Sequence, residues 1–262
     1  MTSIVSITTK PSGGGVSFPA LAYPGVASYT FNSPSEISGS TIVNRSSKTF
    51  DMTMNDSSSI VSGISGCEGT SCFQSTNDNP VTKYAMSSTS LFTTDNTNAT
   101  LSISFWIKSL TTTAPSTNRE YIFTLCQSNV ANYYMSFYID YQGFKITMFG
   151  NSNPTTSVPI PSGGGAYVTK SGGFYTQQWN HFVITSQKKT APSFKVYLNG
   201  VDQNYAPTYN GYFGGITIDK LVIGGFKDGS YGFNGYIDCV RLFSTVLSAS
   251  DVTTLYNSGV PY

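Results

Sequence analysis

Few side chains in this sequence could support acid–base or nucleophilic chemistry. The chain has one histidine, His181, and three glutamates, Glu36, Glu68 and Glu120. Glycoside hydrolysis commonly needs two carboxylates that flank the scissile bond, and none of these glutamates lies in a Glu-x-Asp-x-x-Glu-like strand. Asp140 has no second carboxylate two or four residues away. We therefore interpret the protein as a non-enzyme, with a glycoside hydrolase as the remote alternative.

The four cysteines are too sparse to form the framework of a small secreted domain. Cys67 and Cys72 are close enough in sequence to form a loop disulfide. Cys126 and Cys239 lie in apolar, strand-like runs, where free buried thiols are expected. No histidine accompanies the cysteines at zinc-finger spacing.

The composition argues against several classes of partner. Only 10% of the residues are charged and the net charge is +1. With no cluster of Lys and Arg to bind phosphates, we expect no nucleic-acid partner. No apolar stretch is long enough to cross a bilayer, so we expect no membrane insertion. With 14% aromatic residues the chain can form a core, and its neutral polar remainder is typical of extracellular and virion-surface proteins.

The first residues show no basic segment followed by an apolar run, so no secretory signal is visible. Either a signal was removed, or the protein is made in the cytosol and then assembled, as a virion protein would be. Residues 1–25 are interpreted as an N-terminal arm with a flexible joint at Pro11–Gly15. The arm would dock on a neighbour in a homo- or hetero-assembly; the alternative is a first strand and a loop.

Alternation of apolar and polar residues predicts β-strands along most of the remaining chain. The clearest segments are Leu101–Lys108, Tyr133–Asp140, Phe144–Met148, Phe182–Thr185, Phe194–Leu198 and Leu221–Ile223. Gln142-Gly143 is expected to form a turn. Asn199-Gly200 predicts a type I′ hairpin turn, which needs positive φ at both central positions.

A single helix is expected over Ser248–Asn257. Ser248 can cap its first turn, Asp251 opposes the positive end of the helix dipole, and Gly259 can end it. Many strands followed by one short helix predict an all-β protein, an antiparallel two-sheet jelly-roll sandwich formed by residues 26–262.

Several segments, read in order, resemble one known family. They are Tyr29–Ser33, Ile42–Ser47, Leu101–Lys108, Trp179–Thr185, Val196–Gly200, Leu221–Gly225, Phe233–Phe243 and Leu247-Ser248. Together they resemble the laminin-G-like jelly roll of the concanavalin A-like lectin/glucanase superfamily. The resemblance covers roughly residues 27 to 260.

The resemblance also implies roles for single residues. In related folds an aspartate equivalent to Asp238 can bind a structural Ca²⁺ together with backbone carbonyls, which gives oxygen ligands of the kind that calcium prefers. Asn32 or Asn55 could assist, although Asn32 stands where the family often has Asp. The alternative is that Asp238 pairs with Arg241 or caps a turn. The resemblance makes His181 a packed structural residue, in place of the Ser-His-Asp triad that the many serines would permit on paper.

Sugar binding needs an exposed aromatic ring and polar groups for the hydroxyls. Alternation places Ser104, Trp106 and Lys108 on the face opposite Phe105, and places Tyr134, Tyr138 and Asp140 together. We therefore predict a glycan-binding set formed by Trp106, Tyr134, Tyr138 and Asp140; the alternative is that both faces are covered. Loop aromatics such as Tyr205, Tyr209, Tyr212, Phe213 and Tyr231 suit recognition of sugar or protein, or pack at the rim.

Two functional hypotheses follow. The first is a glycan-binding or adhesion module that recognises a glycan or protein surface, and the second is a structural component of a large assembly such as a minor capsid protein. The fold alone does not choose between them.

Overall fold

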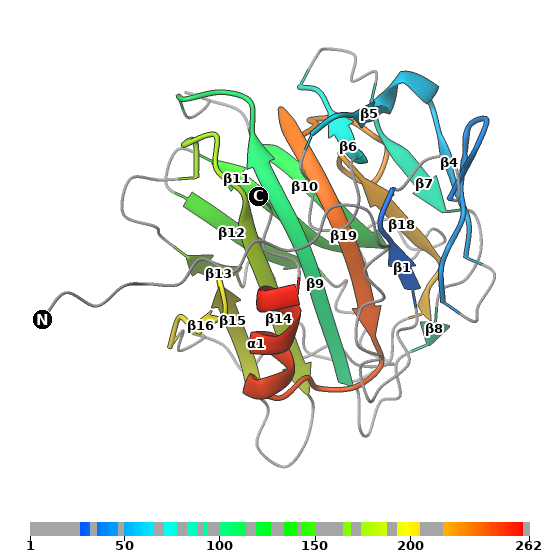
Figure 1. Cartoon of the computed structure of the whole chain (residues 1–262). Coiled ribbons are helices and arrows are strands. Elements are labelled where there is room, and N and C mark those ends of the chain that lie inside the picture. Colours follow the sequence, from blue (N-terminus) through cyan, green and yellow to red (C-terminus); the bar gives the residue numbers. More distant parts are fainter. Residues whose placement is uncertain are drawn as a thin grey trace, which may run out of the picture.

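The computed structural model describes residues 27–31, 36–46, 50–64, 71–77, 83–87, 92–93, 100–113, 119–126, 134–140, 143–149, 165–168, 174–187, 193–204 and 217–258. Over these residues the chain forms two large antiparallel sheets and one helix that lies on the outside of the sandwich (Figure 1). The predicted two-sheet, all-β architecture is therefore confirmed.

The first sheet has eight strands. Its order is β16 (Val201–Asp202), β15 (Ser193–Leu198), β14 (Asn180–Gln187), β9 (Thr100–Ser109), β19 (Gly235–Phe243), β6 (Ser71–Ser75) and β5 (Ile60–Ser62), with β1 (Ala27–Tyr29) also paired to β19. The short 3₁₀-helix η1 (Ser57–Ser59) precedes β5. The long strands β9, β14 and β19 form the middle of this sheet (Figure 1).

The second sheet has nine strands. Its order is β13 (Gly165–Val168), β12 (Gly143–Phe149), β11 (Tyr134–Asp140), β10 (Glu120–Cys126), β18 (Lys220–Ile223), β7 (Ala85–Ser87), β4 (Met52–Met54), β3 (Thr41–Ile42) and β2 (Ile37–Ser38). A small separate sheet pairs β8 (Phe92–Thr93) with β17 (Thr217–Ile218). Gly143 pairs with Asp140, so it begins β12 and does not occupy the turn predicted for it.

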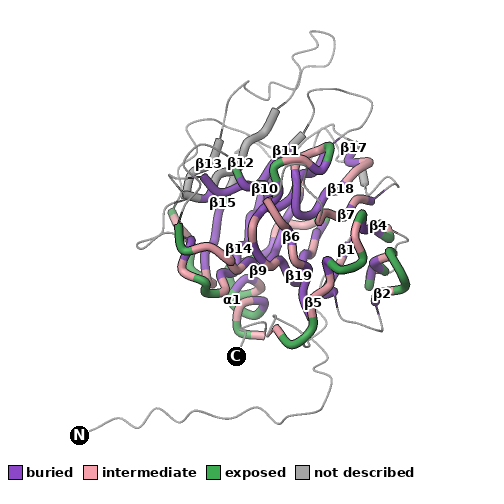
Figure 2. The backbone as a smooth tube through the Cα atoms, turned by 90° about the horizontal axis from the view of Figure 1, so that it is seen from above, coloured by how far each residue is buried: buried purple, intermediate pink, exposed green. Residues whose placement is uncertain are grey.

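The core lies between the two sheets and is rich in phenylalanine. Phe105 of β9 stacks on Phe182 of the same sheet at 5.4 Å between ring centroids. It also meets Phe123 of the second sheet edge-to-face at 4.8 Å, and Phe123 stacks on Phe137 at 4.1 Å. These rings share the inward face because side chains alternate along a strand. Figure 2 shows the buried positions concentrated in the strands of the two layers.

Part of the outer face of the eight-stranded sheet is covered by the helix α1 (Ala249–Ser258). Val252 and Leu255 of α1 pack against Val183, Tyr197 and other buried residues of this face. Ser248 caps the helix as predicted: its Oγ accepts the Asp251 N–H at 3.2 Å, and Asp251 in turn accepts the Ser248 N–H at 2.8 Å. No helix in the described part of the chain is long and apolar enough to cross a membrane.

The Asn199-Gly200 turn joins β15 to β16 and supports the helix. Both residues have positive φ, 51° and 80°, as the type I′ prediction requires. A Cβ atom on Gly200 would lie 3.1 Å from the ring of Tyr256 in α1. Glycine therefore both forms the turn and leaves room for the helix.

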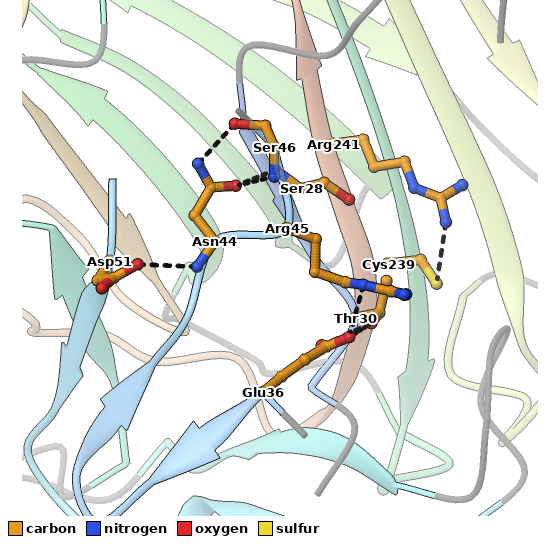
Figure 3. Close-up of polar contacts among 9 residues, drawn as sticks. All are labelled: Ser28, Thr30, Glu36, Asn44, Arg45, Ser46, Asp51, Cys239 and Arg241. Atoms are coloured by element: carbon orange, nitrogen blue, oxygen red, sulfur yellow. Dashed lines mark hydrogen bonds and ion pairs between the residues drawn. The ribbon is translucent and has the colours of Figure 1, made fainter. Parts of the chain in front are cut away.

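A polar cluster holds β1 against the rest of the sandwich (Figure 3). Asn44 Oδ1 accepts the Ser28 N–H at 2.8 Å. Glu36, which is 4% exposed, accepts the Thr30 hydroxyl and forms an ion pair with Arg45 at 3.0 Å. Asn44 belongs to an Asn-Arg-Ser glycosylation acceptor sequence, yet it is buried and donates its Nδ2 to Ser46 Oγ. The asparagine of this acceptor sequence is therefore not exposed.

The cysteine pairing differs from the sequence prediction. Cys72 is a free buried thiol, so it forms no disulfide with Cys67, which lies outside the described residues. Cys126 is free as expected, but Cys239 is disulfide-bonded. Cys239 packs on Trp106 on the outer face of its sheet. The apolar residues on both sides of Cys239 in the sequence did not indicate that its side chain faces outward.

Candidate carbohydrate interface

The predicted glycan-binding residues do not come together. Trp106 lies on β9, and its ring faces outward from the eight-stranded sheet, where His181 stacks on it at 4.8 Å and Tyr256 of α1 at 5.8 Å. It is 3% exposed. Tyr134, Tyr138 and Asp140 lie on β11 of the other sheet. The four predicted residues are therefore split between the two sheets. The alternation of side chains predicts which face of a strand a residue occupies, but it does not predict which sheet the strand joins.

Tyr138 instead belongs to an aromatic cluster on the outer face of the nine-stranded sheet. Its register partner on β10 is Tyr121, and the two rings are 5.1 Å apart. Tyr121 also contacts Phe226 at 4.8 Å and Tyr231 at 6.4 Å. We call Tyr121, Tyr138, Phe226 and Tyr231 the aromatic platform.

The loop at 224–234 carries half of this platform and is tightly anchored. Its first residue donates a hydrogen bond from Gly224 N to Ile122 O at 2.7 Å, and the Thr124 hydroxyl binds Gly225 O at 3.2 Å. A Cβ atom on Gly229, whose φ is 83°, would lie 2.7 Å from the ring of Tyr84. The close packing of these glycines fixes the path of the loop over β10.

Tyr231 is the exposed member of the platform. The residue is 53% exposed, whereas Tyr121 and Tyr138 are 7% and 4% exposed. Its φ is 53°, a left-handed conformation that is uncommon for a bulky residue and that surrounding contacts must stabilise. The contacts come from β10, where the Tyr121 N–H donates to Tyr231 O at 2.8 Å. The strand thus fixes the backbone that carries the exposed ring.

Cationic side chains border the platform. The Arg119 guanidinium lies 5.1 Å from the centroid of the Tyr138 ring and reaches Tyr121 Oη at 3.5 Å. The hydrogen bond to Tyr121 is the main cause that raises the pKa of Arg119, so it stays charged. Lys227 lies over Phe226 with its Nζ 5.7 Å from the ring centroid. Rings, cations and hydrogen-bonding groups therefore meet on one surface.

Glu120 and Asp140 lie at one end of β10 and β11 but face opposite ways. Glu120 pairs with Ile139, whose side chain is in the core, and Asp140 is the next residue on β11. Glu120 therefore points inward, where its Oε1 accepts from Asn77 at 3.4 Å and its Oε2 from Tyr175 at 3.5 Å. Burial raises the pKa of Glu120 to about 7. The two acids do not face each other across a groove as a hydrolytic pair would.

His181 is a packed side chain, as the resemblance implied, and it stacks on Trp106, against which Trp179 also packs. Its Nε2 lies 2.9 Å from Ser104 Oγ, while its Nδ1 has no hydrogen-bond partner among the residues that the structure describes. Burial, together with the positive charge of Arg241, lowers the pKa of His181 to about 3. A catalytic triad needs an acid at Nδ1 and an accessible serine, and Ser104 is 2% exposed.

Asp238, the predicted calcium ligand, is buried in the eight-stranded sheet. Its Oδ1 accepts the Cys239 N–H at 2.7 Å, at the point where the register between β19 and β9 shifts. Asn32 lies outside the described residues, and the described residues contain no group of three His, Cys, Asp or Glu arranged for a metal ion. The proposal of calcium at Asp238 therefore depends on backbone oxygens and water.

The fold and the strand order agree with a family assignment. The laminin-G-like family model described as concanavalin A-like lectin/glucanases superfamily matches residues 78–253. The chain belongs to this superfamily. No protein with a curated description matches the sequence.

Solved structures similar to this concanavalin A-like domain include binding domains of botulinum neurotoxins. The serotype G binding domain has a TM-score of 0.59 at 14% identity, with 88% of this chain and 50% of that one covered. A structure of botulinum neurotoxin type C, whose cell entry is described as dependent upon interaction with two ganglioside molecules, has a TM-score of 0.61 at 16% identity, with 90% of this chain and 51% of that one covered. The serotype D ligand-binding domain in complex with N-acetylneuraminic acid has a TM-score of 0.54 at 15% identity, covering 89% and 50%. The chain spans about half the length of these structures, and the likeness shows the fold.

Sequence reasoning identified Tyr138 and Tyr231 but not their neighbours. Arg119, Tyr121 and Phe226 were missed. The register of β10 against β11 shifts between Tyr121 and Phe123, so Tyr121 does not follow a simple period-two pattern. The one local signal for Arg119 and Tyr121 was the triplet Arg119-Glu120-Tyr121 at the start of an apolar run. A cation close to a tyrosine in sequence is typical of a position at the edge of a binding surface.

Proposed function

We propose that this concanavalin A-like domain is a non-enzymatic carbohydrate-recognition module, and that the aromatic platform is its binding surface. The exposed ring of Tyr231 carries the proposal. An aromatic face that is open to solvent and fixed in direction can stack on the C–H face of a pyranose ring. The anchored 224–234 loop lowers the entropy that binding would otherwise cost.

The geometry of the acidic residues supports a binding role over a catalytic one. Glu120 points into the protein and Asp140 out of it, and Glu36 is held by Thr30 and Arg45. The glycan partners named for the toxin domains are properties of those proteins, and they support a sugar as the ligand class here. Display on a cell or virion surface is part of the proposal and relies on the neutral polar composition.

A glycan array with the full chain tests the proposal. The informative variant is Tyr231→Asn, because asparagine tolerates the left-handed backbone while removing the ring. We expect binding to fall about tenfold, the equivalent of losing about 1.4 kcal/mol of stacking. Tyr231→Phe keeps the ring and should retain binding.

Val201→Ala provides a matched control, since Val201 is 62% exposed and lies on β16 at the edge of the other sheet. It should bind as the parent does. An array without any bound glycan would contradict the proposal. If oligomerisation were then lost on deleting residues 1–25, which lie outside the described residues, the assembly hypothesis would replace it.

A further inference from the structure

We propose that the platform prefers sugars bearing a carboxylate, and that Arg119 is the residue that binds this group. The inference rests on the proposed sugar-binding function of the same surface. It starts from the state of the guanidinium: Arg119 is exposed and forms no ion pair within the described part of the chain. Arg45 and Lys195, by contrast, are paired with Glu36 at 3.0 Å and Asp202 at 2.8 Å.

The platform holds this cation in a defined orientation. The guanidinium lies over the Tyr138 ring and uses Nη1 for its contact with Tyr121 Oη. A guanidinium has five N–H donors in a planar fork, so several remain to face a ligand. Such a fork matches the two oxygens of a carboxylate. Stacking on an aromatic ring leaves the edge of the guanidinium available for this contact.

The rings of the platform connect the cation to the stacking site. Tyr121 contacts both Tyr138 and Tyr231, with ring centroids 5.1 and 6.4 Å away. Arg119 lies over the first ring, while the second is the exposed one. A sugar stacked on Tyr231 would extend across Tyr121 with its acidic substituent toward Arg119. The surface thus offers an apolar contact and an ionic contact next to each other.

The neighbouring charges also favour an anion. Lys227 adds a second positive group over Phe226. Asp140 is 8% exposed, and its charge is the smallest of the causes that raise the pKa of Arg119, of which the Tyr121 hydrogen bond is the largest. Asp228 is exposed, but its Oδ1 accepts both the N–H and the hydroxyl of Ser230. Neither acid neutralises the guanidinium.

The test compares two probes that differ in one acidic residue, 3′-sialyllactose and lactose, titrated into the full chain. We expect the parent protein to bind 3′-sialyllactose at least tenfold more tightly. Arg119→Met keeps the length of the side chain and removes its charge, and it should abolish this preference, measured as the ratio of the two affinities. Arg119→Lys should keep part of the preference, because a point charge replaces the fork. Raising the salt concentration should narrow the difference.

The outcomes separate this inference from the proposed function. If both sugars bind equally, and Tyr231→Asn weakens both, the module binds sugars but the role of Arg119 is refuted. If the acidic preference persists in Arg119→Met, another cation is responsible and the inference is again refuted. If neither an acidic nor a neutral sugar binds, the proposed function fails together with the inference. Thermal melts of both Arg119 variants should match the parent, since the residue is exposed.

Discussion

Glu120→Gln should make the protein more stable at alkaline pH and leave it almost unchanged at acidic pH. Glu120 is 3% exposed, and its two side-chain partners, Asn77 and Tyr175, lie 3.4 and 3.5 Å away. These long contacts, together with a backbone hydrogen bond from Asn234, do not offset the loss of hydration of a buried carboxylate. Its pKa is consequently raised from 4.5 to about 7.

The sign of the pH effect follows from this shift. The folded state binds the proton more tightly than the unfolded state, so the stability that Glu120 contributes is fully present below pH 4.5 and is lost as the pH rises through 7. A difference of 2.5 pKa units (7 minus 4.5) corresponds to about 3 kcal/mol. Glutamine does not titrate and has a similar shape. Its advantage should therefore grow from near zero at acidic pH to about 3 kcal/mol above neutrality.

Urea unfolding of the parent and the variant at pH 5.0 and 8.5 measures this difference directly, and melting temperatures give a second reading. For a chain of this size the gain corresponds to a rise of about 2–4 °C per kcal/mol. Glu36→Gln is the matched control: Glu36 is also buried but is paired with Arg45, so its replacement should destabilise the protein at pH 8.5. A Glu120→Gln effect of the same size at both pH values would refute the reasoning.

Two further perturbations test the structure. Trp106→Ala should lower the free energy of unfolding by about 3–5 kcal/mol, because it removes the ring on which His181 and Tyr256 stack. Sugar affinity, measured well below the melting temperature, should stay at the parent value. A selective loss of sugar binding would show that Trp106 belongs to the binding site. Calcium at Asp238 should raise the melting temperature, and the rise should vanish in Asp238→Ala; a melt that is the same in calcium and in EDTA would argue against the metal.

Much of the local structure was predictable from sequence because it depends on neighbouring residues. Period-two alternation placed Phe105 inward and Trp106 outward on β9. The Asn199-Gly200 turn has the positive φ angles that its residue types favour, and Ser248 caps the helix within the reach of its own side chain. Each of these features is decided within a few residues.

The candidate site was predictable only in part. Tyr138 was predicted as a glycan-binding residue and Tyr231 as a loop aromatic suited to recognition, but their shared neighbour Tyr121 lies beside a register shift that interrupts the alternation. Trp106 was assigned to the binding set because it faces outward, and the helix that covers it begins more than 140 residues later. An outward side chain is available to a ligand only if no distant segment packs on it.

The sequence by itself determined that this chain forms an antiparallel sandwich and that its acidic residues follow no catalytic strand pattern, because both depend on residue type and local spacing. The tertiary structure decided which strands share a sheet, that Cys239 is the described cysteine that is disulfide-bonded, and that Arg119, Tyr121 and Tyr231 meet on one surface. The contact between Tyr121 and Tyr231 joins residues 110 positions apart. Long-range strand pairing and burial stabilise such contacts, and no short segment of sequence contains this information.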